Sequence, residues 1–404
     1  MLLLVQIVVI LALTRAARWL LQPLKQPAVI GEMVAGVLLG PSCLGWLAPN
    51  VFAALFPPSS LEPLNVLSQI GLVLFMFLLG RRVSSRTAAA NARAIVVVGG
   101  VSIVVPFAMG AALATLLHGS LAPSGVGVAP FALFIGTAMS ITAFPVLARI
   151  LIDHGLVETT IGRISIACAA FDDVVGWLGL AAILSLGHPG APGLLVMRAS
   201  LLVVYLLGMC FVLRPQLARM ARNRQGPLDG SPGGFALVLL VALSSALATQ
   251  ALGVHALFGA FFAGLMMPRS AAGEAGIVDQ IEPATTKFLL PLFFALTGLR
   301  TNLQLIGGPG VPLMMAAVLI TAVVGKGVAS AVAARAAGLE WRNAWTIGVL
   351  LNTRGLVELV LLNVGLDAGI LSPVVFSIFV AMTFVTTFIT SPLLHVLTPR
   401  ASPS

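Results

Sequence analysis

Charged residues are scarce in this 404-residue chain: Asp, Glu, Lys and Arg together make up 9% of it, whereas hydrophobic residues make up 59%. Soluble globular proteins carry roughly 25% charged residues, so this chain has too few charges to build a surface that faces water. Lipid must be its main solvent, and only helices or a closed barrel can span lipid with every backbone polar group paired. The apolar runs are long and continuous rather than alternating, which predicts an all-α polytopic membrane protein.

Cysteine and histidine are few as well. The three cysteines, Cys43, Cys168 and Cys210, are odd in number and lie in apolar stretches, and the five histidines show no ligand spacing. This pattern predicts neither a disulfide framework nor a metal-ligand cluster, and we expect no cofactor. The N-terminus also lacks the positive charge that precedes the apolar part of a signal peptide, since its first basic residue is Arg15. We therefore expect a first membrane span rather than a cleaved leader.

Basic residues indicate how the chain is threaded through the membrane. We expect about 13 spans, near residues 1–20, 27–47, 63–80, 94–117, 127–152, 160–186, 194–214, 235–252, 254–268, 284–299, 311–336, 342–365 and 371–397. Alternate connections, together with the C-terminal tail, hold 18 of the 22 Lys and Arg residues. The positive-inside rule then places the N-terminus outside and the C-terminus in the cytosol, in what we expect to be a bacterial inner membrane. The net charge of +9 is thus explained by topology and does not call for a nucleic-acid partner.

The expected domain organisation is a single transmembrane domain over residues 1–397. Its first half covers about residues 1–213, a polar cytosolic linker about 214–234, and its second half about 235–397. Residues 398–404 would form a short cytosolic tail, with no cytosolic regulatory domain after the last span.

Charged residues inside the expected spans are the strongest pointers to function, because a charge at the bilayer centre costs several kcal/mol. Asp172 and Asp173 are adjacent near the middle of the sixth span. Consecutive helical residues differ by about 100° in direction, so one carboxylate can face a cavity while the other meets a partner. The alternative is a structural pair neutralised by a buried cation.

Further charges lie in the eleventh and twelfth spans. Lys326 lies between two glycines that allow close helix approach, and it is either a lysine that releases its proton or a fixed counter-ion. Arg354 and Glu358 are four residues apart and can pair on one helix face, either as part of the transport site or only to neutralise each other.

Two spans contain helix-breaking sequences. Pro145 cannot donate a hydrogen bond to Ile141, so the fifth span is expected to break near Thr142, unless the proline only kinks it. Asn352, Thr353 and Gly355 weaken the twelfth span because all three are poor helix formers. These spans are seven apart and therefore run in opposite directions, as two inverted repeats require. Interrupted helices at corresponding positions of inverted repeats point to a binding site at the membrane midplane.

Two further titratable residues remain open. His255 is a possible proton-carrying group or a structural histidine near a helix end. Glu32 begins a span beside the basic first loop and is either involved in pH sensing or a carboxylate that stabilises a helix start.

At these residues the chain resembles cation:proton antiporters of the second branch of that superfamily, and within it the cation/H+ exchanger subgroup. The matching stretches are Ile30-Gly-Glu-Met-Val-Ala-Gly-Val-Leu-Leu-Gly-Pro41, Ser140-Ile-Thr-Ala-Phe-Pro-Val-Leu-Ala-Arg149, the Asp172-Asp173 pair, Gly253-Val-His-Ala-Leu-Phe-Gly-Ala-Phe261, Lys326 and Asn352-Thr-Arg-Gly-Leu-Val-Glu-Leu359. Two features depart from relatives: Leu79-Gly-Arg-Arg-Val83 stands where an acidic residue usually follows the glycine, and the long soluble tail of many relatives is missing. Potassium-efflux relatives of the Kef type carry Gln-Asp at the acidic pair and a nucleotide-binding tail, and the chain has neither.

The resemblance implies a fold with two crossed broken helices, a mobile core beside a dimerisation domain, and a homodimer. It implies that Asp173 binds both the cation and the proton, that Asp172 pairs with Lys326, and that Thr142 contributes from the first broken helix. The expected function is exchange of a monovalent cation, Na+ or K+, for protons, by a transporter and not an enzyme.

Three other functions are weaker readings. A channel would need a filter-like segment of carbonyls, and none is seen. An intramembrane aspartyl protease would need aspartates on two helices, whereas Asp172 and Asp173 share one. A transporter-like sensor without flux stays open.

Overall fold

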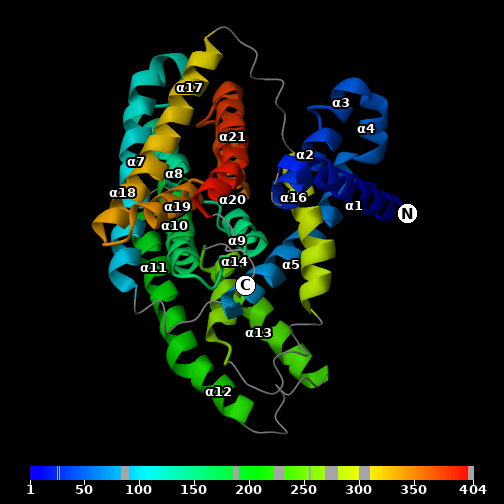
Figure 1. The fold of residues 1–404 in the computed structure, drawn as a ribbon. Coiled ribbons are helices and arrows are strands. Elements are labelled where there is room, and N and C mark those ends of the chain that lie inside the picture. The colour runs from blue at the N-terminus through cyan, green and yellow to red at the C-terminus, as the bar shows by residue number, and fades with distance from the viewer. Residues whose placement is uncertain are drawn as a thin grey trace.

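The computed structural model describes residues 1–24, 26, 28–82, 91–184, 191–222, 232–253, 256–268, 281–299 and 310–398. Within these ranges the chain is helical and contains no strand, as Figure 1 shows. Nine of the described helices are long and apolar enough to cross a membrane. The all-α membrane architecture expected from the sequence is therefore confirmed.

The described helices follow one another in the order of the chain. Their bounds are α1 (Leu2–Leu21), α2 (Ala28–Leu39), α3 (Leu44–Leu47), α4 (Pro49–Leu55), α5 (Pro58–Arg82), α7 (Ala92–Leu121), α8 (Val128–Ser140), α9 (Phe144–Asp153), α10 (Thr160–Leu184), α11 (Ala191–Gly208), α12 (Arg214–Arg222), α13 (Pro232–Ala251), α14 (Ala256–Met266), α16 (Leu290–Leu299), α17 (Val311–Ala322), α18 (Ala329–Ala336), α19 (Trp341–Leu351), α20 (Leu356–Asp367) and α21 (Pro373–Leu397). Short segments η1 (Gln22–Leu24, 3-10), η2 (Met209–Leu213), η3 (Thr285–Leu289) and η5 (Val323–Val328), the last three π-helical, continue neighbouring helices.

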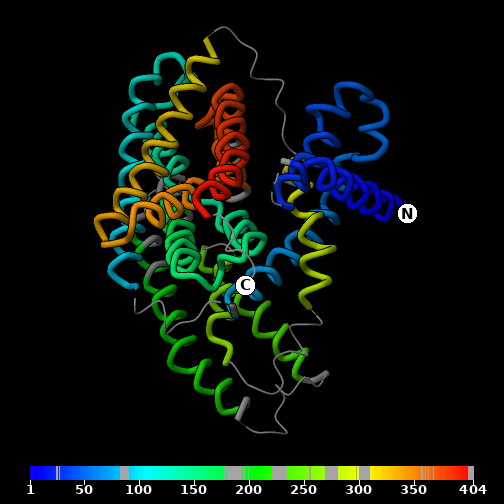
Figure 2. The backbone as a smooth tube through the Cα atoms, viewed as in Figure 1, coloured from blue at the N-terminus to red at the C-terminus, as the bar shows by residue number. Residues whose placement is uncertain are grey.

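Two groups of helices can be followed in Figure 1. One contains α7, α8, α10 and α17–α21, and the other contains α1–α4 and α16. Helices α5, α13 and α14 pack together below and between them. The N-terminus lies at the outer end of α1, away from the first group (Figure 2).

Glycines allow the closest helix crossings. A Cβ atom added at Gly36 of α2 would collide with the carbonyl of Ala295 on α16, and one added at Gly298 would collide with the carbonyl of Met33. Small residues at reciprocal positions let two backbones approach closely, which is how membrane helices gain packing without a hydrophobic driving force.

Both expected helix interruptions are present. Helix α8 ends at Ser140 and α9 begins at Phe144, with Pro145 in the first turn of α9, where its missing N–H group costs no hydrogen bond. Helix α19 ends at Leu351 and α20 begins at Leu356. The two breaks contain residues 141–143 and 352–355, and they supply the frame of the candidate site.

Helical structure extends into the polar stretch. The sequence predicts a polar linker over about residues 214–234, and within it α12 continues from α11 and η2 as far as Arg222. Arg and Leu are good helix formers, and exposed Arg214 and Arg219 can keep their charges in water while Leu217 is buried. The polar stretch therefore begins as helix.

Candidate functional site

The two adjacent aspartates lie in the middle of α10, which packs against α7, α8, α9 and α19. Both side chains are buried, with 1% of Asp172 and 6% of Asp173 exposed. Because the residues are consecutive on one helix, their carboxylates leave in different directions. Their surroundings differ accordingly.

Asp172 is surrounded by hydrogen-bond donors. Its Oδ2 atom lies 2.8 Å from Lys326 Nζ and accepts a hydrogen bond from Thr142 Oγ1 at 2.6 Å. Its Oδ1 atom accepts from Ser102 Oγ at 3.2 Å. One cationic and two hydroxyl donors stabilise the ionised carboxylate, so Asp172 is suited to remain a charged partner of the lysine.

Lys326 lies in η5, the π-helical segment between α17 and α18, and its side chain is completely buried. Besides Asp172, its ammonium donates to the carbonyl oxygens of Ser102, at 3.1 Å, and of Ser140. All three ammonium hydrogens thus have an acceptor. Isolated π-helical turns are common at functional sites, and this one places the lysine at the end of the first half-helix.

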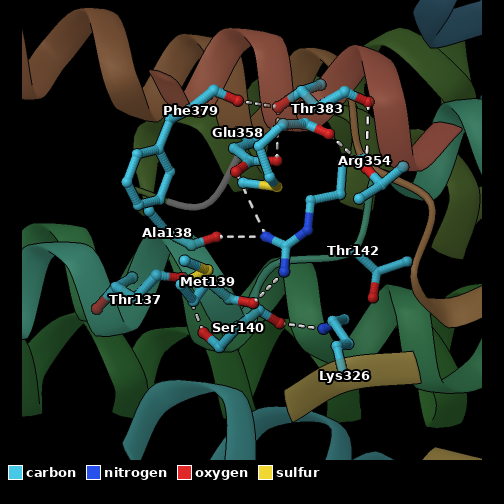
Figure 3. A network of polar contacts seen from close by, with 12 residues as sticks. Thr137, Ala138, Met139, Ser140, Thr142, Lys326, Arg354, Glu358, Phe379 and Thr383 are labelled. Atoms are coloured by element: carbon cyan, nitrogen blue, oxygen red, sulfur yellow. Dashed lines mark hydrogen bonds and ion pairs between the residues drawn. The ribbon is translucent and has the colours of Figure 1, made fainter. Parts of the chain in front are cut away.

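Arg354 binds the same half-helix end from the other side. Its Nη1 and Nη2 atoms donate to the carbonyl oxygens of Ala138 (2.9 Å) and Met139 (2.6 Å), as seen in Figure 3. The carbonyls at the C-terminus of a helix have no partner within the helix and carry partial negative charge. Arg354 and Lys326 together satisfy the last carbonyls of α8, including that of Ser140, with two positive charges.

Glu358 completes this network in the first turn of α20. Its Oε1 atom lies 3.4 Å from Arg354 Nη1, and its Oε2 atom accepts a hydrogen bond from Thr383 Oγ1 at 3.1 Å. Thr387 accepts from the N–H of Arg354 at 3.0 Å and donates to its carbonyl at 2.6 Å. Helix α21 therefore holds the second break in place through two threonines.

The breaks also contact each other directly. The N–H of Ala143 donates to the carbonyl of Thr353 at 3.0 Å, and Thr142 Oγ1 lies 3.1 Å from the carbonyl of Leu351. Two helix C-termini and two helix N-termini consequently meet beside Asp172 and Asp173.

Asp173 differs from Asp172 and Glu358, the two other acids of the charge cluster formed with Lys326 and Arg354. Its Oδ1 atom is buried and has no hydrogen-bond partner among the described residues. The Oδ1 atom of Asn352, in the second break, has none there either. Buried oxygens without donors can accept a proton or coordinate a cation.

The charges of the cluster do not cancel. Asp172, Asp173 and Glu358 carry three negative charges when ionised, against the two positive charges of Lys326 and Arg354. One negative charge is left over in a buried place. One proton or one monovalent cation would neutralise it.

The structure brings together most of the residues singled out in the sequence. The cluster includes Lys326, Arg354 and Glu358. Thr142 contacts it by donating a hydrogen bond to Asp172, not to Asp173. His255 lies outside the described residues. No group of three or more His, Cys, Asp or Glu residues capable of holding a metal ion occurs in the described part of the chain.

Sequence reasoning missed the hydroxyl and carbonyl partners. The sequence does not single out Ser102, Thr383 or Thr387, because isolated Ser and Thr residues are ordinary in membrane helices, and Ser140 takes part through its backbone carbonyl. Glu32 lies in the second turn of α2 and is fully buried, so it is not a helix-start carboxylate.

The comparisons with known proteins agree with this architecture. Residues 8–398 match the model of the transmembrane sodium/hydrogen exchanger family. The chain is 39% identical over 399 residues to the Na(+)/H(+) antiporter NhaS4 of Synechocystis, which covers 97% of this chain and 96% of the relative. It is 36% identical to cation/H(+) antiporter 17 of Arabidopsis thaliana over 97% of this chain, and it spans about half (48%) of that relative.

A solved structure shares the fold. The sodium proton antiporter MjNhaP1 from Methanocaldococcus jannaschii superimposes with a TM-score of 0.60 at 14% identity, over 98% of each chain. The family model covers nearly the whole sequence and the cyanobacterial relative matches from end to end, so this chain belongs to the sodium/hydrogen exchanger family of membrane transporters.

Proposed function

We propose that this protein exchanges a monovalent cation for protons across the membrane, with Asp173 as the group that binds both. The observation that carries the proposal is the contrast between the two aspartates. Asp172 has three donors, whereas Asp173 Oδ1 is buried without one. The relatives named as Na(+)/H(+) and cation/H(+) antiporters support the same transport class.

The physical basis of exchange is competition for one negative charge. With Asp173 protonated, the remaining charges of Asp172, Glu358, Lys326 and Arg354 sum to zero. A cation that enters the site needs the ionised carboxylate and therefore displaces the proton. While Lys326 stays protonated, the site is neutral with either occupant and can move through a low-dielectric barrier far more easily than the empty, charged site. The site therefore crosses only with a proton or a cation bound, and this couples the flux of cations to the flux of protons.

The two breaks supply further oxygen ligands. Thr142, in the first break, and Asn352, in the second, offer side-chain oxygens beside the acidic pair. Arg354 and Lys326 hold the C-terminal carbonyls of α8, so the partial negative charge of that helix end is already neutralised. Oxygen ligands suit both Na+ and K+, and the choice between them depends on the size of the cavity and the number of ligands.

Charge movement depends on Lys326. If the lysine stays protonated, the cluster is neutral with either a proton or a cation bound, and exchange of one for one moves no net charge. If it releases its proton when the cation binds, two protons exchange for one cation, the cation-loaded cluster carries one net negative charge, and one charge crosses the membrane per cycle. We propose the second cycle, in which the membrane potential contributes about 2.3 kcal/mol per 100 mV.

The remaining parts of the proposal concern assembly and topology. We propose a homodimer in a bacterial inner membrane, with the N-terminus outside and the C-terminus in the cytosol. The concentration of basic residues in alternate connections supports this orientation. The helix group containing α7, α8, α10 and α17–α21 would move as the core that carries the site.

Exchange in proteoliposomes tests the proposed function. Purified protein is reconstituted with an internal pH-sensitive dye, and Na+, K+ or Li+ is added outside in parallel. We expect at least one of these cations to drive proton movement that protein-free liposomes lack. Binding of a cation without any proton movement would instead identify a transporter-like sensor.

A further inference from the structure

A second buried charge cluster lies where α2 meets α9, the second half of the first broken helix. Glu32 of α2 is completely buried, and Arg149 of α9 is 7% exposed. Asp153, in the last turn of α9, is more open, with 23% of its side chain exposed. Among the described residues, the ion pairs and hydrogen bonds of these three side chains do not reach the cluster around Asp172.

Arg149 is shared unequally between the two acids. Its Nε atom lies 3.3 Å from Asp153 Oδ1, whereas its Nη2 atom lies 3.9 Å from Glu32 Oε1. Its Nη1 atom donates to the carbonyl of Thr286 at 3.4 Å. Asp153 Oδ2 also accepts the N–H of Ala28 at 3.0 Å, at the N-terminus of α2. Asp153 thus has the closer cation and a helix N-terminus, both of which stabilise its charge.

Glu32 has no such support. Both of its carboxylate oxygens are buried without a hydrogen-bond donor among the described residues. Helix α1 carries two exposed arginines, of which Arg18 interacts with Glu32 from a distance, and α3 and α16 bring no charged residue to α2. Among the described residues, Lys287 and Glu282 are the further charged groups close to Thr286 in the sequence. A buried carboxyl group without donors is more stable with a proton bound.

We propose that Glu32 is a second proton-binding site, separate from Asp172 and Asp173, that controls the contact between α2 and the broken helix α9. When Glu32 loses its proton, the new buried charge draws Arg149 away from Asp153. Asp153 then loses its cation while still holding the N-terminus of α2. Because α9 begins immediately after Thr142 and Ala143, a change at its far end can be transmitted along a rigid helix to the transport site.

The proton occupancy of Glu32 can be measured without transport. Infrared difference spectra of the reconstituted protein, recorded between mildly acidic and alkaline pH, report the C=O stretching band of a protonated carboxyl group. We expect one such band to disappear in Glu32→Gln and to remain in Glu62→Gln, a matched change at an exposed acid of α5. An unchanged set of bands in Glu32→Gln overturns the proposal. If Glu32→Gln fails to fold, Glu32→Asp replaces it: the band must then shift, and an unshifted band also overturns the proposal.

The second measurement is the pH profile of exchange, and it rests on the proposed function. A single titrating group changes the rate by up to about tenfold per pH unit. We expect Glu32→Gln to remove this part of the profile while the cation concentration for half-maximal rate stays the same. A pH profile identical to that of wild type overturns the regulatory role. If the wild type shows no exchange, only the antiporter function is refuted. The infrared titration would still decide whether Glu32 binds a proton.

Discussion

The N–H group of Ala143 donates a hydrogen bond to the carbonyl of Thr353 at 3.0 Å, and this contact joins two helix breaks that lie 210 residues apart in the sequence. Neither break could satisfy this backbone pair alone. An interrupted helix at membrane depth is stable only where protein or a water-filled cavity supplies partners for the freed backbone groups. The crossing is therefore a mutual arrangement, and the residues around it are the ones to test.

Asp173→Asn is expected to abolish exchange without loss of folded protein. An amide can coordinate a cation weakly, but it cannot bind and release a proton, so the coupling is lost. The measurement is cation-driven proton flux in proteoliposomes, with thermal unfolding in detergent as the check on folding. Glu62→Gln, the same kind of change on an exposed acid, is the matched control. Exchange by Asp173→Asn at a rate near that of wild type would contradict its role.

Lys326→Gln tests whether exchange moves net charge. Flux of Na+ against protons is recorded while a potassium-diffusion potential is imposed, so that the transported cation does not disturb the potential. We expect the wild type to respond to the potential, because one charge crosses per cycle, and the variant not to respond. A wild type that ignores the potential would rule out the two-proton cycle. A variant that still responds would show that the second proton is carried elsewhere.

Arg354 and Glu358 are expected to stabilise the protein as a coupled pair. Arg354→Gln leaves two carbonyl oxygens of α8 and the Glu358 carboxylate without their cation, and removing one partner of a buried pair costs about 3–5 kcal/mol. Thermal unfolding of both single variants and of the double variant gives the coupling. We expect the double variant Arg354→Gln with Glu358→Gln to be less destabilised than the sum of the two. Strict additivity would mean that the ion pair contributes nothing.

Cysteines placed in the two breaks should report an accessible path. After removal of Cys43, Cys168 and Cys210, single cysteines at Ala143 and Asn352 are expected to react with membrane-permeant thiol reagents. Their reaction should change with pH or added cation, because occupancy of the site alters its exposure. A cysteine at Ala148 serves as the unreactive control, because Ala148 is as buried as Ala143 but lies inside α9 and not in a break. Equal protection at all three positions would show that no ion path runs between the breaks.

The sequence by itself determined the class of protein. A chain with 9% charged residues has to use lipid as solvent, and its long apolar runs have to be helices. The position of Pro145 and of Asn352-Thr353 also located both breaks to within a few residues, because a missing N–H group and weak helix formers act locally. The i,i+4 spacing also predicted the pairing of Arg354 with Glu358, but Arg354 lies in the break before α20 and only Glu358 lies in the helix, so the expected shared helix face is wrong.

Tertiary structure decided which groups meet. Nothing in the local sequence indicated that Arg354 would bind the carbonyls of Ala138 and Met139, or that Ser102 would bond to Asp172. The surroundings of Glu32, for which the sequence left pH sensing and a helix-start carboxylate open, depended equally on tertiary packing, because the approach of α9 places Arg149 3.9 Å from this buried acid. Helix periodicity specifies which residues share a face of one helix, whereas the partner across the interface depends on how separate helices pack. A buried charge is therefore visible in the sequence, but the group that neutralises it is known only from the fold.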